Sequence, residues 1–173
     1  KVIVVVTQEP NEPFVRECLA AVAGDIDMVI AIGGGSTIDT SKAMTAFLRW
    51  GRIHVKDIDV PHRAPLLIAL PTTVGTGSEV SRYYVLTEES TGRKRASRAW
   101  TICPDLALVD PEFLAATPDA LLISGSFDAF CHLWETYVSR TERSPFSTML
   151  AKEGLVRLMS AIDDRMKGIP VNS

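Results

Sequence analysis

Residues 33–36 read Gly-Gly-Gly-Ser and stand between an apolar run and a stretch with helical spacing. Backbone amides at the start of a helix bind phosphate groups, and glycines let a phosphate approach the main chain because no Cβ intervenes. Ser36 could cap the helix or bond a phosphate oxygen. Gly33, Gly34, Gly35 and Ser36 therefore predict a phosphate site, although the pattern is neither GxGxxG nor a P-loop. A tight turn between strand and helix is the alternative.

A second loop, "PTTVGTGSE" at 71–79, follows another apolar run. Carboxyl ends of parallel strands share one edge of a sheet, where open α/β sheets bind ligands. We therefore expect this loop to contribute to the same site, and a Gly/Thr-rich turn is the alternative. Its candidate binding residues are Thr72, Thr73, Gly75, Thr76 and Ser78.

Asp128 and His132 form a third candidate group. They are four residues apart, so on a helix they share a face and could bind one divalent cation, with Glu135 one turn further along. A surface hydrogen bond between the two side chains is the alternative interpretation.

The elements that must position these residues follow from apolar periodicity. Strands are expected at 2–6, 27–32, 65–70 and 106–111, and helices at 12–22, closed by Gly24, and from Ser36 or Thr37 onward. A hairpin is expected at 81–97, around the polar turn "EESTG". Alternating strands and helices predict an α/β domain with a parallel sheet over 1–111, followed at 112–173 by the beginning of an all-α domain.

Composition excludes several classes of protein. The net charge of −3 and the pI near 5.6 give no case for binding nucleic acid, and no apolar stretch reaches the ~20 residues of a membrane span. Three cysteines without CxxC spacing and no visible secretory leader predict a cytoplasmic protein. The sequence begins at Lys1 directly before an apolar run, so we expect a piece of a longer polypeptide, cut at both ends.

Four motifs together resemble the iron-dependent (group III) alcohol dehydrogenases: "GGGSTIDTSKA", "PTTVGTGSEVS", "PDLALVDPEFLAATP" and "GSFDAFCHLWETYVS". The resemblance implies a Rossmann-like nucleotide-binding domain followed by an all-α metal-binding domain, as in the dehydroquinate-synthase-like superfold, here incomplete. It further implies hydride transfer between NAD or NADP and a small alcohol or aldehyde, a bound Fe²⁺ or Zn²⁺, and a homo-oligomer, expected to be a dimer.

The resemblance also assigns roles to single residues. It places the dinucleotide pyrophosphate on residues 33–36 and matches the second nucleotide loop to residues 72–78. Asp39 and Lys42 occupy the polar positions after the first loop, and Lys94 matches a lysine after the hairpin turn. For Asp39 and Lys42 the alternatives are an acid that complements the helix dipole and a solvated helix lysine. Asp128 and His132 match the first two metal ligands, with a catalytic role through the metal.

Two departures from the family pattern affect these expectations. No histidine follows His132, whereas the family takes two more metal ligands from further along, and His54 and His62 match no ligand position and are expected on the surface. The family's first strand is also expected before Lys1, so this segment alone is expected to be inactive. The alternatives are a glycerol-dehydrogenase-like or sugar-phosphate-cyclase-like enzyme of the same superfold, or a non-catalytic nucleotide-binding remnant. The phenylalanine between the two ligands favours the NADP-using, butanol-dehydrogenase-like branch.

Overall fold

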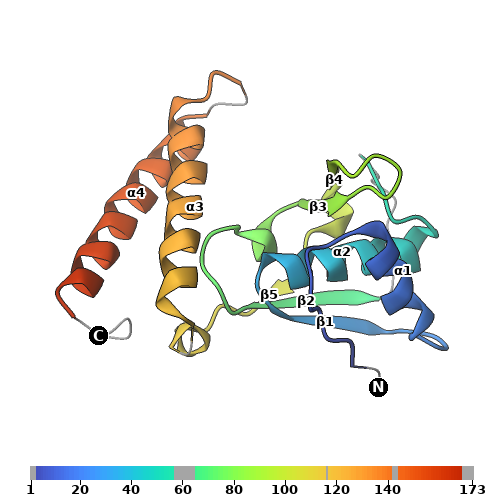
Figure 1. The fold of residues 1–173 in the computed structure, drawn as a ribbon. Helices are drawn as coiled ribbons and strands as arrows, with labels where there is room; N and C mark the ends of the chain where they lie inside the picture. Colours follow the sequence, from blue (N-terminus) through green and yellow to red (C-terminus); the bar gives the residue numbers. More distant parts are fainter. Residues whose placement is uncertain (1–2, 57–64, 116, 142–143, 169–173) are drawn as a thin grey trace. The chain divides into compact units, whose positions relative to one another are not determined.

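The computed structural model of the chain describes residues 3–56, 65–115, 117–141 and 144–168 (Figure 1). Contacts divide the chain into two compact units. The first unit comprises residues 1–71 and 78–109, and the second comprises residues 72–77 and 110–173. The short segment 72–77 therefore belongs with the helical part of the chain, although residues of the first unit flank it on both sides.

The first unit contains a parallel sheet of the strands β1 (Met28–Gly33), β2 (Leu66–Pro71) and β5 (Leu106–Ala107), in the order β1-β2-β5. Helix α2 (Gly35–Trp50) lies between β1 and β2 in sequence, because parallel neighbours need a crossover connection. Gly33 is opposite Pro71 in the register, so both strands end at the same edge. The predicted α/β fold with a parallel sheet is confirmed.

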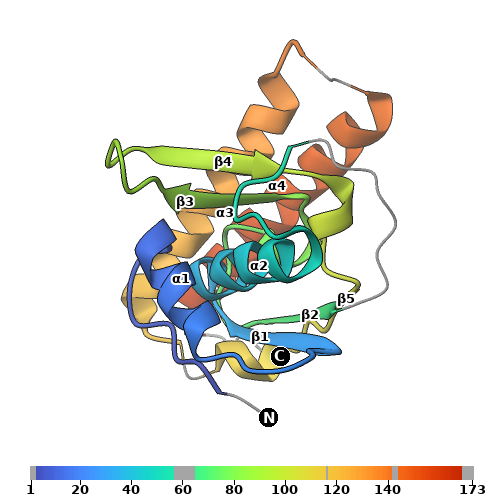
Figure 2. The same cartoon turned by 90° about the vertical axis from the view of Figure 1, so that its right-hand side faces the viewer.

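Helix α2 lies between this sheet and the antiparallel hairpin of β3 (Tyr83–Thr87) and β4 (Lys94–Arg98) (Figures 1 and 2). Helix α1 (Glu12–Ala20) packs beside α2, and the short helices η1 (Ser78–Val80) and η2 (Trp100–Ile102) flank the hairpin in sequence. The hairpin is the one expected at 81–97. It places β3 over the face of α2 that the sheet leaves free.

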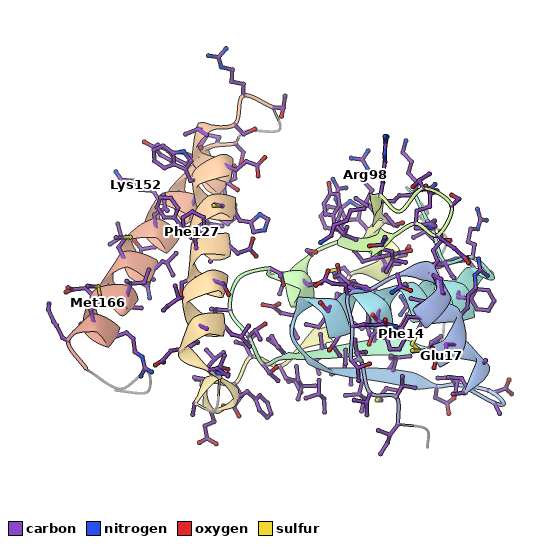
Figure 3. All side chains as sticks on the ribbon, in the orientation of Figure 1. Phe14, Glu17, Arg98, Phe127, Lys152 and Met166 are labelled. Atoms are coloured by element: carbon purple, nitrogen blue, oxygen red, sulfur yellow. The ribbon has the colours of Figure 1, made fainter. Side chains whose placement is uncertain are left out.

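The main core lies between α1, α2 and the hairpin. On α1, the apolar spacing turns Phe14, Val15 and Cys18 inward and leaves Glu17 exposed (Figure 3). Tyr84 and Leu86 enter the same core from β3. A smaller cluster lies between sheet and helix and consists of Ala31, Ile38 and Ala69. On the opposite face of the sheet the apolar side chains of β1 and β2 are exposed, namely Met28, Ile30, Ile32 and Leu66.

Two sequence-based expectations near the N-terminus are wrong. Residues 3–6 do not form a strand, because no strand pairs with them within the described residues; Val4 and Val6 only pack against the core, and Ile3 is 76% exposed. Helix α1 ends before Gly24. Its C-cap is Ala21, whose amide bonds the carbonyl of Cys18 and so tightens the last turn.

The second unit contains η3 (Pro111–Leu114), α3 (Asp119–Val138) and α4 (Pro145–Met166). A capping box starts α4, in which Ser144 and Ser147 each satisfy a backbone amide of the other. Helices α3 and α4 pack against each other, with Gly154 against Leu133. Between 112 and 168, the described residues contain helices and no strand. No helix among the described residues is long and apolar enough to cross a membrane.

Candidate functional site

The glycine run stands where β1 ends and α2 begins. Gly34 is the N-cap of α2, and its carbonyl accepts the hydrogen bond from the amide of Ile38 at 3.1 Å. Gly34 has no side chain, so no side-chain cap bonds the first amides of this helix. The cap is thus Gly34, and the expectation that Ser36 could cap the helix is wrong. The start of α2 offers backbone N–H groups and the positive end of a helix dipole.

The first two glycines of the run differ in what requires them. Gly33 has φ +156°, and a Cβ there would lie 2.5 Å from Oγ1 of Thr37, closer than atoms can approach. Packing within the first unit therefore requires this glycine. Gly34 has φ −78° and ψ −171°, values that any residue adopts. Backbone conformation therefore does not explain the second glycine.

Asp39 on α2 is a partly buried hydrogen-bond acceptor. Its carboxylate accepts from Oγ of Ser78 at 2.5 Å and from the amide of Val85 at 2.9 Å. Burial raises the pKa of the Asp39 carboxyl, although these hydrogen bonds oppose the shift. Asp39 thus connects α2 to η1 and β3 by hydrogen bonds. Its role is not limited to complementing the helix dipole.

Lys42, one turn further along α2, is 0% exposed, so its interpretation as a solvated helix lysine is wrong. Its ammonium donates to the carbonyls of Ser81 at 2.8 Å and Tyr83 at 2.7 Å, and to Oγ of Ser81 at 3.3 Å. Burial lowers the pKa of the Lys42 ammonium to about 8.

The second loop lies in the second unit as far as Gly77. The carbonyl of Thr72 accepts from Oγ1 of Thr117 at 3.1 Å, and Gly75 and Gly77 have φ of +127° and +59°. A cavity of about 290 Å³ opens here, lined by Thr72, Thr73, Phe113, Thr117, Pro118 and Leu121. The sequence singled out the two threonines of the loop. Of the other lining residues, Phe113, Thr117 and Pro118 lie within the motif "PDLALVDPEFLAATP", and Leu121 lies beyond it.

Residues 72–77 also pack directly on α3. A Cβ added to Gly125 would lie 2.3 Å from the carbonyl oxygen of Val74, and one added to Gly75 would lie 3.1 Å from Oδ2 of Asp128. Both glycines are therefore needed for a contact between backbones. Gly125 was not among the sequence-predicted residues, because a glycine inside a helix carries no signal of what packs against it.

Asp128 and His132 share one side of α3, as their spacing requires. Oδ1 of Asp128 lies 3.6 Å from Nε2 of His132, and the side chains are 46% and 59% exposed, respectively. A carboxylate and an imidazole this close can bind one cation from the same side. Among the residues that the structure describes, no group of three potential metal ligands forms. The donor set thus fits a metal ion, but it is two ligands of a site that needs more.

Lys94 and the upstream histidines lie elsewhere in the chain. Lys94 begins β4, and its ammonium pairs with Glu9 at 3.3 Å on the surface of the first unit. The expectation of a surface position for His54 is wrong. Its ring is mostly buried, with Nε2 at 2.6 Å from Oε1 of Glu12 and Nδ1 at 2.9 Å from Oγ of Ser97. His62 falls outside the described residues.

Comparisons with known proteins agree on one family. The family model described as "Iron-containing alcohol dehydrogenase" matches residues 1–111. The NADPH-dependent butanol dehydrogenase of Clostridium saccharobutylicum is 37% identical over 135 residues, which are 75% of this chain and 34% of that protein. The 4-hydroxybutyrate dehydrogenase of Cupriavidus necator is 32% identical over 156 residues, 86% of this chain and 40% of that protein.

Solved structures extend the likeness into the helices. The crystal structure of an iron-containing alcohol dehydrogenase from Thermotoga maritima matches with a TM-score of 0.85 and 29% identity, over 97% of this chain and 47% of that one. The chain spans between a third and a half of the length of these relatives. The likeness therefore covers both units described above but not the whole of any of these proteins.

Proposed function

Because the chain belongs to the iron-containing alcohol dehydrogenase family, we propose that it takes part in hydride transfer between NAD or NADP and a small alcohol or aldehyde. The observation that carries this proposal is the start of α2, where a glycine N-cap with ordinary dihedral angles leaves the first helical amides without a side-chain cap. An anion such as a pyrophosphate is the ligand that these amides suit.

In this proposal, residues 33–36 bind the pyrophosphate, and the loop from Thr72 to Ser78 holds another part of the dinucleotide. The cavity beside Thr72 and Thr73 has mostly apolar lining from Phe113, Pro118 and Leu121, which suits a flat ring system rather than a phosphate. The nicotinamide itself carries the hydride, so the contribution of the chain is to bind and orient it. The name of the butanol dehydrogenase supports NADPH as the donor.

Asp128 and His132 would supply two of the ligands to the metal, and we propose iron rather than zinc because the matching family is the iron-containing one. When bound, such an ion polarises the substrate oxygen as a Lewis acid and stabilises alkoxide character. The packing of Gly75 against α3 holds the Asp128 carboxylate beside the second loop. This places a proposed metal ligand next to a proposed dinucleotide-binding segment within one unit.

A small alcohol or aldehyde is the substrate class that the names of the relatives favour, and a homodimer stays a prediction. The second candidate function is dinucleotide binding without catalysis, favoured by the pair of metal ligands that lacks a third partner among the described residues. Metal content separates the two candidates, because a binding module has no need of the ion.

The test uses two variants of the full-length protein. Gly34→Val should abolish NADH and NADPH binding in a fluorescence titration, because the added side chain fills the space of a phosphate, while circular dichroism shows a retained fold. His132→Ala should remove iron, measured by elemental analysis, and turnover of butanol, but should keep dinucleotide binding. Unchanged titrations for Gly34→Val would refute the dinucleotide site, and retained iron in His132→Ala would place the metal elsewhere.

A further inference from the structure

Helix α2 carries a partly buried aspartate, Asp39, and a fully buried lysine, Lys42, whose hydrogen bonds all end on one stretch of chain. Asp39 accepts from Ser78 and from the amide of Val85, and Lys42 donates to Ser81 and Tyr83. Residues 78–85 comprise η1 and the first part of β3, where the chain re-enters the first unit after the loop 72–77. The same helix begins at the glycine run. One rigid element therefore connects the proposed pyrophosphate loop to the segment that follows the second loop.

The ammonium of Lys42 has no hydrogen left for a ligand. Its three N–H groups have three acceptors on residues 81–83, and the side chain is fully buried. The charges of Asp39, Cys103 and Glu79 oppose the lowering of the Lys42 pKa that burial causes. A direct contact with a phosphate would require breaking bonds to backbone carbonyls, which would then stay unsatisfied.

We propose that Lys42 is a positioning residue for dinucleotide binding, which acts by fixing residues 78–83 against α2 and not by touching the dinucleotide. This inference rests on the proposed function. Two of the three bonds end on main-chain carbonyls, so they fix the backbone itself, and Ser78 is held from the same helix by Asp39. A segment that is already ordered costs less entropy when a ligand binds beside it.

Arg49 offers a matched control on the same helix. Its side chain is also fully buried, and its guanidinium donates to the carbonyls of Pro65, at 2.7 and 3.1 Å, and Thr101, at 2.5 Å, and pairs with Asp105 at 2.8 Å. These partners lie at the start of β2 and around η2, outside residues 78–83. Losing Arg49 removes four hydrogen bonds, against three for Lys42, but it leaves residues 78–83 tied to α2.

The experiment compares Lys42→Met, Lys42→Arg and Arg49→Met in the full-length protein. We measure the Kd of NADPH and of NADH by fluorescence titration, the KM and kcat of alcohol oxidation, and the melting temperature. Lys42→Met should weaken dinucleotide binding roughly tenfold, the equivalent of one charged hydrogen bond, and should act on KM more than on kcat. Lys42→Arg should recover part of the affinity, because a guanidinium still donates to the carbonyls.

Arg49→Met should lower the melting temperature without a comparable change in the dinucleotide Kd. Equal losses of affinity in Lys42→Met and Arg49→Met would overturn the inference, because Lys42 would then act only through general stability. Wild-type affinity in Lys42→Met would overturn it as well. If Lys42→Met does not fold, Lys42→Gln takes its place, with an expected affinity below that of Lys42→Arg. A wild-type protein that binds neither dinucleotide would refute the proposed function, and the inference with it.

Discussion

Replacing Gly125 by alanine tests the contact between residues 72–77 and α3. The new Cβ would lie 2.3 Å from the carbonyl oxygen of Val74, whereas carbon atoms in ordinary contact are ~3.5–4.0 Å apart. The backbone of the loop and the backbone of the helix must therefore separate by roughly 1 Å or more. Overpacking of this kind costs about 1–3 kcal/mol, and a glycine-to-alanine change inside a helix returns about 1 kcal/mol of helix propensity.

Gly154→Ala on α4 is the matched control, because it has the same gain in propensity. Its Cβ would lie 2.7 Å from Cδ2 of Leu133, the end of a flexible side chain that can rotate away. Both variants gain the same helix propensity, so this gain cancels when their free energies of unfolding are compared. We therefore expect Gly125→Ala to have a free energy of unfolding about 1–3 kcal/mol below that of Gly154→Ala.

Urea denaturation of both variants, followed by circular dichroism, measures this difference. Combining Gly125→Ala with Val74→Ala should not restore stability, because the clash is with the carbonyl group, which every residue carries. If Gly125→Ala proved as stable as Gly154→Ala, the close backbone contact between residues 72–77 and α3 would not exist. The placement of Asp128 beside the loop would then be wrong.

Three further predictions follow from other contacts. Gly33→Ala should lower the free energy of unfolding by about 1–3 kcal/mol, because its Cβ meets Thr37 at 2.5 Å; urea denaturation measures the loss. Asn11→Ala should cost about 0.5–2 kcal/mol in the same assay, since Oδ1 of Asn11 caps α1 by accepting from the amide of Phe14. The pKa of Lys42 is lowered from 10.5 to about 8, so the unfolded chain binds more protons between these values, and stability should rise with pH in that window. Stability curves of wild type and Lys42→Met should differ in slope there, and equal slopes would refute the burial of the ammonium.

Much of the fold follows from apolar periodicity. The strand ending at Gly33, the strand ending at Pro71 and the hairpin around residues 83–98 lie where the sequence predicts them, since their patterns are long and regular. The prediction of a strand at 3–6 is wrong because β-branched residues form a strand only where a neighbouring strand supplies hydrogen bonds, and none of the described strands pairs with this run.

The candidate site was predictable in part. Glycines and hydroxyl residues after strands signal a ligand edge, and a spacing of four residues signals a shared helix face. Burial of Lys42 and His54 was not predictable, because a charged residue is normally exposed and only long-range partners make its burial possible. The same holds for Gly125, whose partner lies in a distant loop. Such pairings depend on tertiary structure, which a local pattern does not encode.

The grouping of residues 72–77 with the later helices bears on how this protein is synthesised. The chain leaves the first unit after residue 71, returns at 78 and leaves again after 109. The hydroxyl of Thr117 that bonds the carbonyl of Thr72 is translated 45 residues after it, roughly 2–9 s later at usual elongation rates. During that interval the start of α2 has its strand and helix partners, whereas the threonine–glycine loop has none of its packing on α3. The nascent chain thus completes the packing around the glycine run before that of the threonine–glycine loop, and a protease acting on the ribosome-bound chain should cut first within residues 72–77.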